Sequence, residues 1–102
     1  MRCEISIQKS YADGDIVKNI PEDIIISAKA YVVDLLMEFS FVVKCEDCHC
    51  YYDDVLNNIK YRSDLIVCSI DSDRVLDEKY IRTRLLHIVC IGKNLIVRCN
   101  FY

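Results

Sequence analysis

The sequence predicts a small, mostly β domain in which one N-terminal helix precedes a meander of about five antiparallel strands. Three observations lead to this fold class. The chain has 102 residues, of which 53% are apolar, and this suits a single compact domain. After Pro21, apolar residues recur at helical spacing. In the second half, valine and isoleucine dominate, as strands require.

The first element is a short strand over residues 1–9, where apolar and polar residues alternate. The polar stretch that follows contains Asp13-Gly14, which is a turn signal. A helix is then predicted over residues 21–39, because a proline suits the first helical position and acidic residues complement the positive helix end. The apolar residues at helical spacing are Ala28, Val32, Leu35, Leu36 and Phe39.

After this helix the apolar period changes from helical spacing to alternation. Asp71-Ser72-Asp73 is interpreted as a turn or helix cap, and residues 73–79 as one helical turn or a polar hairpin tip. Residues 92–94 form a tight connection before the last strand. The predicted strands cover residues 41–46, 50–56, 64–70, 82–91 and 95–101.

The composition excludes several classes of protein. A net charge of −3 excludes a generally basic nucleic-acid-binding tail, although it leaves room for a local basic patch. No apolar run approaches the roughly 18 residues of a membrane span. The polar start of the chain is unlike a signal peptide. We therefore expect an intracellular protein, in the nucleus or the cytoplasm or both, that does not contact a membrane.

Seven cysteines are many for a chain of this length. Without a secretory signal, they are interpreted as reduced thiols or metal ligands rather than as a disulfide framework. Cys45 and Cys48 form the kind of pair with which zinc knuckles present two thiolates, and His87 with Cys90 offers a second pair. The alternative is that most of the cysteines are small buried apolar residues. A strand over 82–91 would also direct His87 and Cys90 to opposite faces.

The sequence offers no arrangement of residues that predicts catalysis. His49 and His87 are the only histidines, and no Ser-His-Asp or Cys-His spacing accompanies them. The two glycines, Gly14 and Gly92, lie too far apart in the chain to form a phosphate-binding loop. We therefore expect no enzymatic activity and no cofactor.

The second half of the sequence resembles the Sm/LSm family, small RNA-associated β-barrels that form rings. The hydrophobic spacing of the family's first motif is met by residues 52–56, by Lys60 and by residues 63–67. The spacing of its second motif, an aliphatic strand after a glycine step, is met by residues 90–97. The predicted N-terminal helix matches the helix that precedes the strands in this family.

This resemblance implies an architecture and a function. The architecture is a bent, five-stranded, antiparallel open barrel within a domain over residues 21–102, with residues 1–20 as an extension that carries a short strand. The function is that of a subunit of an RNA-processing ribonucleoprotein, as in mRNA splicing. Such a subunit assembles with other Sm-fold proteins through edge strands, here 82–91 and 95–101, and contacts uridine-rich RNA.

Most polar residues of the family's motifs are replaced in this chain. The family's glycine, aspartate, asparagine and arginine correspond to Asp54, Lys60, Asp64 and Ile91. By resemblance, the RNA-binding residues are Arg62, Asp64, Gly92 and Lys93. An arginine at position 62 can still stack on a base, whereas a carboxylate at position 64 offers no hydrogen-bond donor and repels phosphate.

Three other interpretations stay open. The replaced residues favour an Sm-fold assembly factor without RNA contact. A second interpretation is an α+β sandwich in which the strand 1–9 joins the main sheet and residues 51–61 form a helix, because apolar residues there share a helical face. That fold suggests a virus- or lineage-specific protein-interaction module. The third is a zinc-stabilised binding module.

Overall fold

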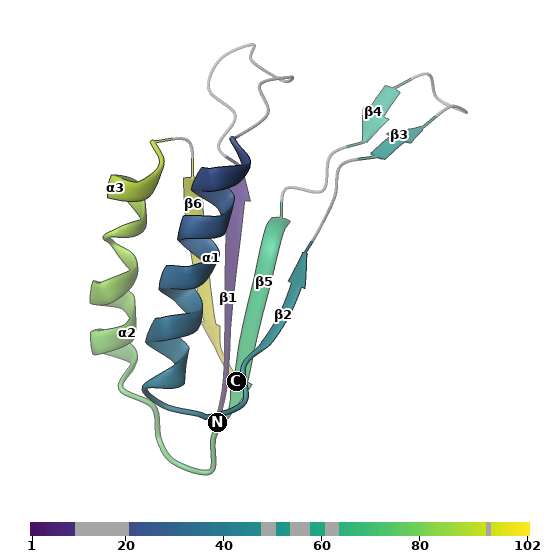
Figure 1. The fold of residues 1–102 in the computed structure, drawn as a ribbon. Helices are drawn as coiled ribbons and strands as arrows, with labels where there is room; N and C mark the ends of the chain where they lie inside the picture. The colour runs from purple at the N-terminus through teal and green to yellow at the C-terminus, as the bar shows by residue number, and fades with distance from the viewer. Residues whose placement is uncertain (10–20, 48–50, 54–57, 61–63, 94) are drawn as a thin grey trace.

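The computed structural model describes residues 1–9, 21–47, 51–53, 58–60, 64–93 and 95–102. The elements in chain order are β1 (Arg2–Lys9), α1 (Glu22–Met37), β2 (Lys44–Asp47), β3 (Tyr51–Asp53), β4 (Asn58–Lys60), β5 (Asp64–Asp71), α2 (Glu78–Leu85), α3 (Ile88–Ile91) and β6 (Leu95–Phe101). The strands β3 and β4 pair with each other in a hairpin outside the main sheet (Figure 1).

The main sheet contains four antiparallel strands in the order β2-β5-β1-β6. The helices cover one face of this sheet (Figure 1). Without the β3–β4 hairpin, and with α2 and α3 taken as one helical segment, the order of elements is β-α-β-β-α-β, the split βαβ or ferredoxin-like arrangement. In this arrangement β5 and β6 run parallel with β1 between them, so the chain must cross the sheet to connect them.

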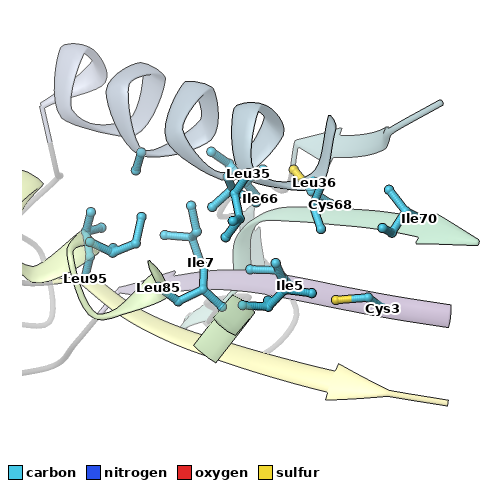
Figure 2. Close-up of a cluster of buried hydrophobic side chains, with 14 of the residues drawn as sticks. Cys3, Ile5, Ile7, Leu35, Leu36, Ile66, Cys68, Ile70, Leu85 and Leu95 are labelled. Atoms are coloured by element: carbon cyan, nitrogen blue, oxygen red, sulfur yellow. The ribbon is translucent and has the colours of Figure 1, made fainter. Parts of the chain in front are cut away.

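The core lies between the sheet and the helices. Alternate residues of β1 and β5 point toward the helices and are buried, whereas their neighbours face the other side of the sheet. Figure 2 shows these side chains meeting α1 in one layer. The buried apolar residues are Cys3, Ile5, Ile7, Ala28, Val32, Leu35, Leu36, Ile66, Cys68, Ile70, Leu76, Ile81, Leu85, Ile88 and Leu95.

The predicted barrel is wrong. The chain starts with a strand rather than a helix, and the main sheet is an open sheet of four strands. The strand at residues 2–9 is one of the two central strands, because it pairs with both β5 and β6. The α+β alternative correctly places the strand 1–9 in the main sheet, which helices cover on one face. Its helix over 51–61 is wrong, because β3 and β4 lie within that segment.

The strand predicted over residues 82–91 is wrong as well, because α2 and α3 occupy this segment. The start of α2 is fixed by Asp77, whose side chain accepts a hydrogen bond from the backbone N–H of Tyr80 at 3.0 Å. Arg82 and Arg84 lie in the last turn, where cations complement the negative helix end. None of the described helices is long and apolar enough to cross a membrane.

The burial pattern explains why this segment is helical. Ile81, Leu85 and Ile88 are spaced by four and three residues, so they share one helical face, and all three are buried. Leu86 and Val89 lie on the other side of the helices and are exposed. The apolar run from Leu85 onward therefore includes both the buried face of the helices and exposed apolar residues. Such a continuous apolar run predicts a strand when only the sequence is considered.

A hydrogen-bonded cluster ties α2 to α1. The hydroxyl of Tyr31 donates to the backbone carbonyl of Arg84 at 2.7 Å. The guanidinium of Arg84 donates to the Tyr80 hydroxyl at 2.7 Å, and that hydroxyl donates to the carboxylate of Glu38 at 3.0 Å. These contacts hold the two helices side by side, and they occupy the guanidinium of Arg84 with partners on α1 and α2.

Gly92 connects α3 to β6 where there is little room for a side chain. A Cβ atom at this position would lie 2.8 Å from Cγ2 of Ile24 and 3.0 Å from Cδ1 of Leu95. We expect Gly92→Ala to lower the free energy of unfolding by about 1–2 kcal/mol, because the side chain of Ile24 or Leu95, or the element that carries it, must shift. Urea denaturation measures the effect, with the exposed neighbour Lys93→Ala as the control. Equal stability of the two variants would contradict this close packing.

Candidate functional site

The described part of the chain has an apolar groove between the helices and the last strand, which we call the β6 groove. It has a volume of about 390 Å³ and is lined by Arg82, Leu85, Leu86, Val89, Leu95, Ile96, Val97 and Cys99. Leu85 and Leu95 are buried, whereas Leu86, Val89 and Ile96 are 71%, 61% and 45% exposed. Exposed apolar side chains that gather around one groove are typical of an interaction surface.

The β6 groove runs beside an edge of the sheet with which no described strand pairs. β6 is the last strand in the sheet order. Arg2 and Tyr102 exchange both backbone hydrogen bonds, at 3.0 and 2.8 Å, so even-numbered β6 residues direct their backbone groups toward β1. By the same alternation, Val97 and Cys99, which line the groove, direct their N–H and C=O groups outward. A free edge of this kind accepts another strand.

The charge around this edge differs from that of the rest of the chain. Residues 78–102 contain five lysine or arginine residues and one acidic residue, whereas the whole chain has a net charge of −3. Arg84 is engaged in the α1–α2 cluster. Arg82, which lies 5.1 Å from the centroid of the Phe101 ring, forms no ion pair with any described residue, and neither do Lys93 and Arg98. The edge therefore presents cations that no carboxylate of the described chain neutralises.

The opposite face of the sheet lacks the features of an RNA-binding sheet. Four-stranded sheets that bind RNA stack bases on aromatic residues. Neither central strand, β1 or β5, contains an aromatic residue. Arg2 and Glu4, which share this face, lie 3.5 Å apart as an ion pair, and Lys44 and Glu46 follow on β2. This face therefore carries balanced charge and offers no stacking platform on its central strands.

The predicted RNA-binding residues do not form a described cluster. Arg62 lies outside the described residues. Asp64 is the first residue of β5 and pairs with Gln8 of β1. Gly92 and Lys93 lie between α3 and β6. These segments lie at the same end of the sheet, but β1 separates β5 from β6.

The predicted metal ligands are also spread across the fold. Cys48 lies outside the described residues, and Cys45 lies on β2 at one edge of the sheet. His87 precedes α3 and Cys90 lies within it, and α3 packs against α1 and β6 near the other edge. Within the described ranges, no group of three His, Cys, Asp or Glu residues is arranged to hold a metal ion.

Sequence reasoning missed the residues of the β6 groove. The alternation pattern places Leu86 and Val89 in a strand, and no predicted site includes Arg82 or Arg98. One signal was present, because the last quarter of this acidic chain is basic. A charge count by segment would have marked residues 78–102 as a candidate site for an acidic partner.

Comparisons with known proteins found no matching protein family, no matching characterised protein and no matching solved structure.

Proposed function

We propose that this chain is a protein-interaction module that binds an extended peptide segment of alternating apolar and acidic residues along β6. One coincidence carries the proposal. An edge with which no described strand pairs, an apolar groove and cations that no described carboxylate neutralises lie together. Strand addition to a free edge supplies affinity through backbone hydrogen bonds, and pockets for alternate side chains supply specificity.

The geometry of an added strand defines the sequence of the partner. Side chains of a strand point alternately to the two faces of the sheet. Those on the helix side enter the β6 groove and contact Leu86 and Val89, which calls for apolar residues. Those on the other side lie beside Arg98, which pairs with Ser6 on the helix-free face, and this favours acidic residues. The partner segment is thus apolar and acidic at alternate positions.

Charge argues against a second copy of this chain as the occupant. A symmetric pair of β6 strands would bring the same edge of both copies together. Arg82 and Arg98 of one copy would then face a cationic edge, and like charges across a strand pair are destabilising. An acidic segment removes this repulsion.

The Sm/LSm resemblance implies a role in RNA processing that depends on a barrel, and the main sheet is not a barrel. The resemblance also implies assembly through the last strand, and the position of β6 at the edge of the sheet supports this. An Sm-fold partner has no such support, because the barrel that predicted it is absent. RNA binding is therefore retained as an outcome of the test.

We expect a labelled peptide as long as β6, alternating valine and glutamate, to bind the intact chain, and Val89→Asp to weaken binding by at least about tenfold. An aspartate there loses apolar contact and repels the acidic peptide. Fluorescence anisotropy measures both. Val75→Asp is the matched control, because Val75 is 87% exposed and does not line the groove.

We also expect Arg98→Glu to weaken binding of the valine–glutamate peptide. The same variant should strengthen binding of a peptide in which lysine replaces each glutamate.

Backbone methylation of the peptide tests strand addition itself. Two peptides are compared, one methylated on the backbone nitrogens of its odd positions and one on those of its even positions. The peptide whose methyl groups block hydrogen bonds to Val97 and Cys99 should not bind, whereas the other should still bind. Equal loss of binding for the two methylated peptides would contradict strand addition. Binding of a uridine-rich oligonucleotide that Arg98→Glu abolishes, with no peptide binding, would replace the proposal with an RNA-binding role. Concentration-dependent dimerisation that Val89→Asp abolishes would identify a second copy as the occupant.

A further inference from the structure

Two cysteines face each other across β2 and β5. Cys45 and Cys68 are register partners, and their Sγ atoms lie 2.7 Å apart. This separation is only a little longer than a disulfide bond of about 2.0 Å. Cys68 is fully buried beneath α1, whereas Cys45 lies on the edge strand and is exposed. One thiol of the pair is thus accessible to a small reagent and the other is shielded.

The register of β2 and β5 also places Cys45 and Cys68 at a separation that suits a disulfide bond. Ser72 donates its N–H to the Met1 carbonyl at 2.9 Å, so odd-numbered β1 residues bond to β5, and Cys68 directs its backbone groups toward β1. Cys45 and Cys68 therefore form a non-hydrogen-bonded pair, in which the Cα atoms lie about 4.5 Å apart and the side chains are closest. This falls within the roughly 4.4–6.8 Å range of Cα separations in disulfides.

We propose that Cys45 and Cys68 form a reversible disulfide bond that locks β2 onto β5 when a disulfide oxidant such as oxidised glutathione is present. The thiolate of Cys45 attacks one sulfur of oxidised glutathione, the sulfur–sulfur bond breaks, and one glutathione thiolate leaves. Cys68 then loses its proton to solvent and attacks the Cys45 sulfur, which releases the second glutathione. The two cysteines lose two electrons and oxidised glutathione gains them.

The surroundings of the two thiols set the order of these steps. Burial, with the hydrogen bond to Cys45, raises the pKa of Cys68, so Cys68 is a poor attacking group at neutral pH. The exposed Cys45 reacts first, and Cys68 resolves the mixed disulfide once the two sulfurs are held together. We expect the resolving step to become faster as the pH rises, because deprotonation of Cys68 limits it.

The same sheet contains a matched control pair. The Sγ atoms of Cys3 and Cys99 lie 3.9 Å apart, but Cys3 faces Phe101 and Cys99 faces Ile5. The two cysteines are therefore diagonal neighbours, whose Cα atoms lie about 7–8 Å apart. A disulfide cannot span more than about 7 Å without movement of the backbone. We expect this pair to stay reduced under conditions that oxidise Cys45 and Cys68.

The bond would stabilise the four-residue edge strand β2, which pairs only with β5 in the main sheet. A link between positions 45 and 68 closes a loop of the unfolded chain, and we expect the oxidised form to melt on the order of 10 °C higher. This inference does not depend on peptide binding, because β2 and β6 form opposite edges of the sheet.

The experiment treats the full chain with oxidised glutathione, blocks remaining thiols with an alkylating agent, and identifies linked peptides by mass spectrometry without reduction. We expect one intramolecular link, between Cys45 and Cys68, which reduced glutathione reverses. Cys45→Ser should prevent the link and the rise in Tm. Cys68→Ala should stop at a glutathione adduct on Cys45. The double variant Cys48→Ser, Cys50→Ser serves as a control and should keep the link.

Other results would overturn the proposal. A link between Cys45 and Cys48 or Cys50, a link between Cys3 and Cys99 in its place, or full alkylation of Cys45 and Cys68 after oxidation would each contradict it. A Cys45–Cys68 link that leaves Tm unchanged would contradict the locking of β2.

Discussion

Ile5→Ala is expected to lower the free energy of unfolding by about 3–4 kcal/mol. Ile5 is fully buried on β1, which pairs with strands on both sides, so the cavity cannot collapse easily. A domain of this size has a stability of about 5–15 kcal/mol, and the variant would lose a large part of it. Urea denaturation followed by circular dichroism measures the loss.

The matched control for this prediction is Ile26→Ala on α1. Ile26 is 59% exposed, so its truncation should change the free energy of unfolding by less than about 0.5 kcal/mol. If the two variants lose the same free energy of unfolding, β1 is not a central strand of the sheet. The comparison thus tests the sheet order with one residue type.

Thr83→Pro is expected to cost about 3 kcal/mol or more. Thr83 lies inside α2, and its hydroxyl donates to the Lys79 carbonyl at 2.7 Å. An α-helix also pairs the Thr83 N–H with this carbonyl, and proline removes that donor and clashes with the preceding turn. Denaturation followed at the helical circular dichroism band measures both the stability and the loss of helix.

Glu78→Pro provides the control in the same helix. Glu78 is the first helical residue, where the backbone N–H has no partner in the helix and proline is favoured. The capping residue Asp77 has ψ of 88°, outside the helical range that a following proline disfavours. We expect the stability to change by less than about 0.5 kcal/mol. If Thr83→Pro lowers the free energy of unfolding no more than Glu78→Pro does, residues 78–85 do not form a helix.

Much of the secondary structure follows from local pattern. The strand predicted over residues 1–9 and the helix predicted over 21–39 correspond to β1 and α1. The strands predicted over 64–70 and 95–101 correspond to β5 and β6. In each case one period fits clearly, because the buried face of a strand repeats every two residues and that of a helix every three or four.

The candidate site could not be predicted in the same way. Leu86, Val89 and Ile96 look like core residues in the sequence, and only the packing of α2 and α3 shows that they surround the β6 groove. The pairing of Cys45 with Cys68 depends on the register of β2 and β5, which are separate segments of the chain. The basic charge of residues 78–102 was visible in the sequence, but its place beside a free edge was not.

The sequence by itself determined which segments form β1, α1, β5 and β6, because their periods are set by neighbours in the chain. Tertiary structure decided the segment 82–91, whose apolar run suits both a helix and a strand. Since β1 lies between β5 and β6, those two strands run parallel, and the chain between them must cross the sheet rather than turn back as a hairpin. α2 and α3 lie in that crossing connection, which depends on a strand at the other end of the sequence.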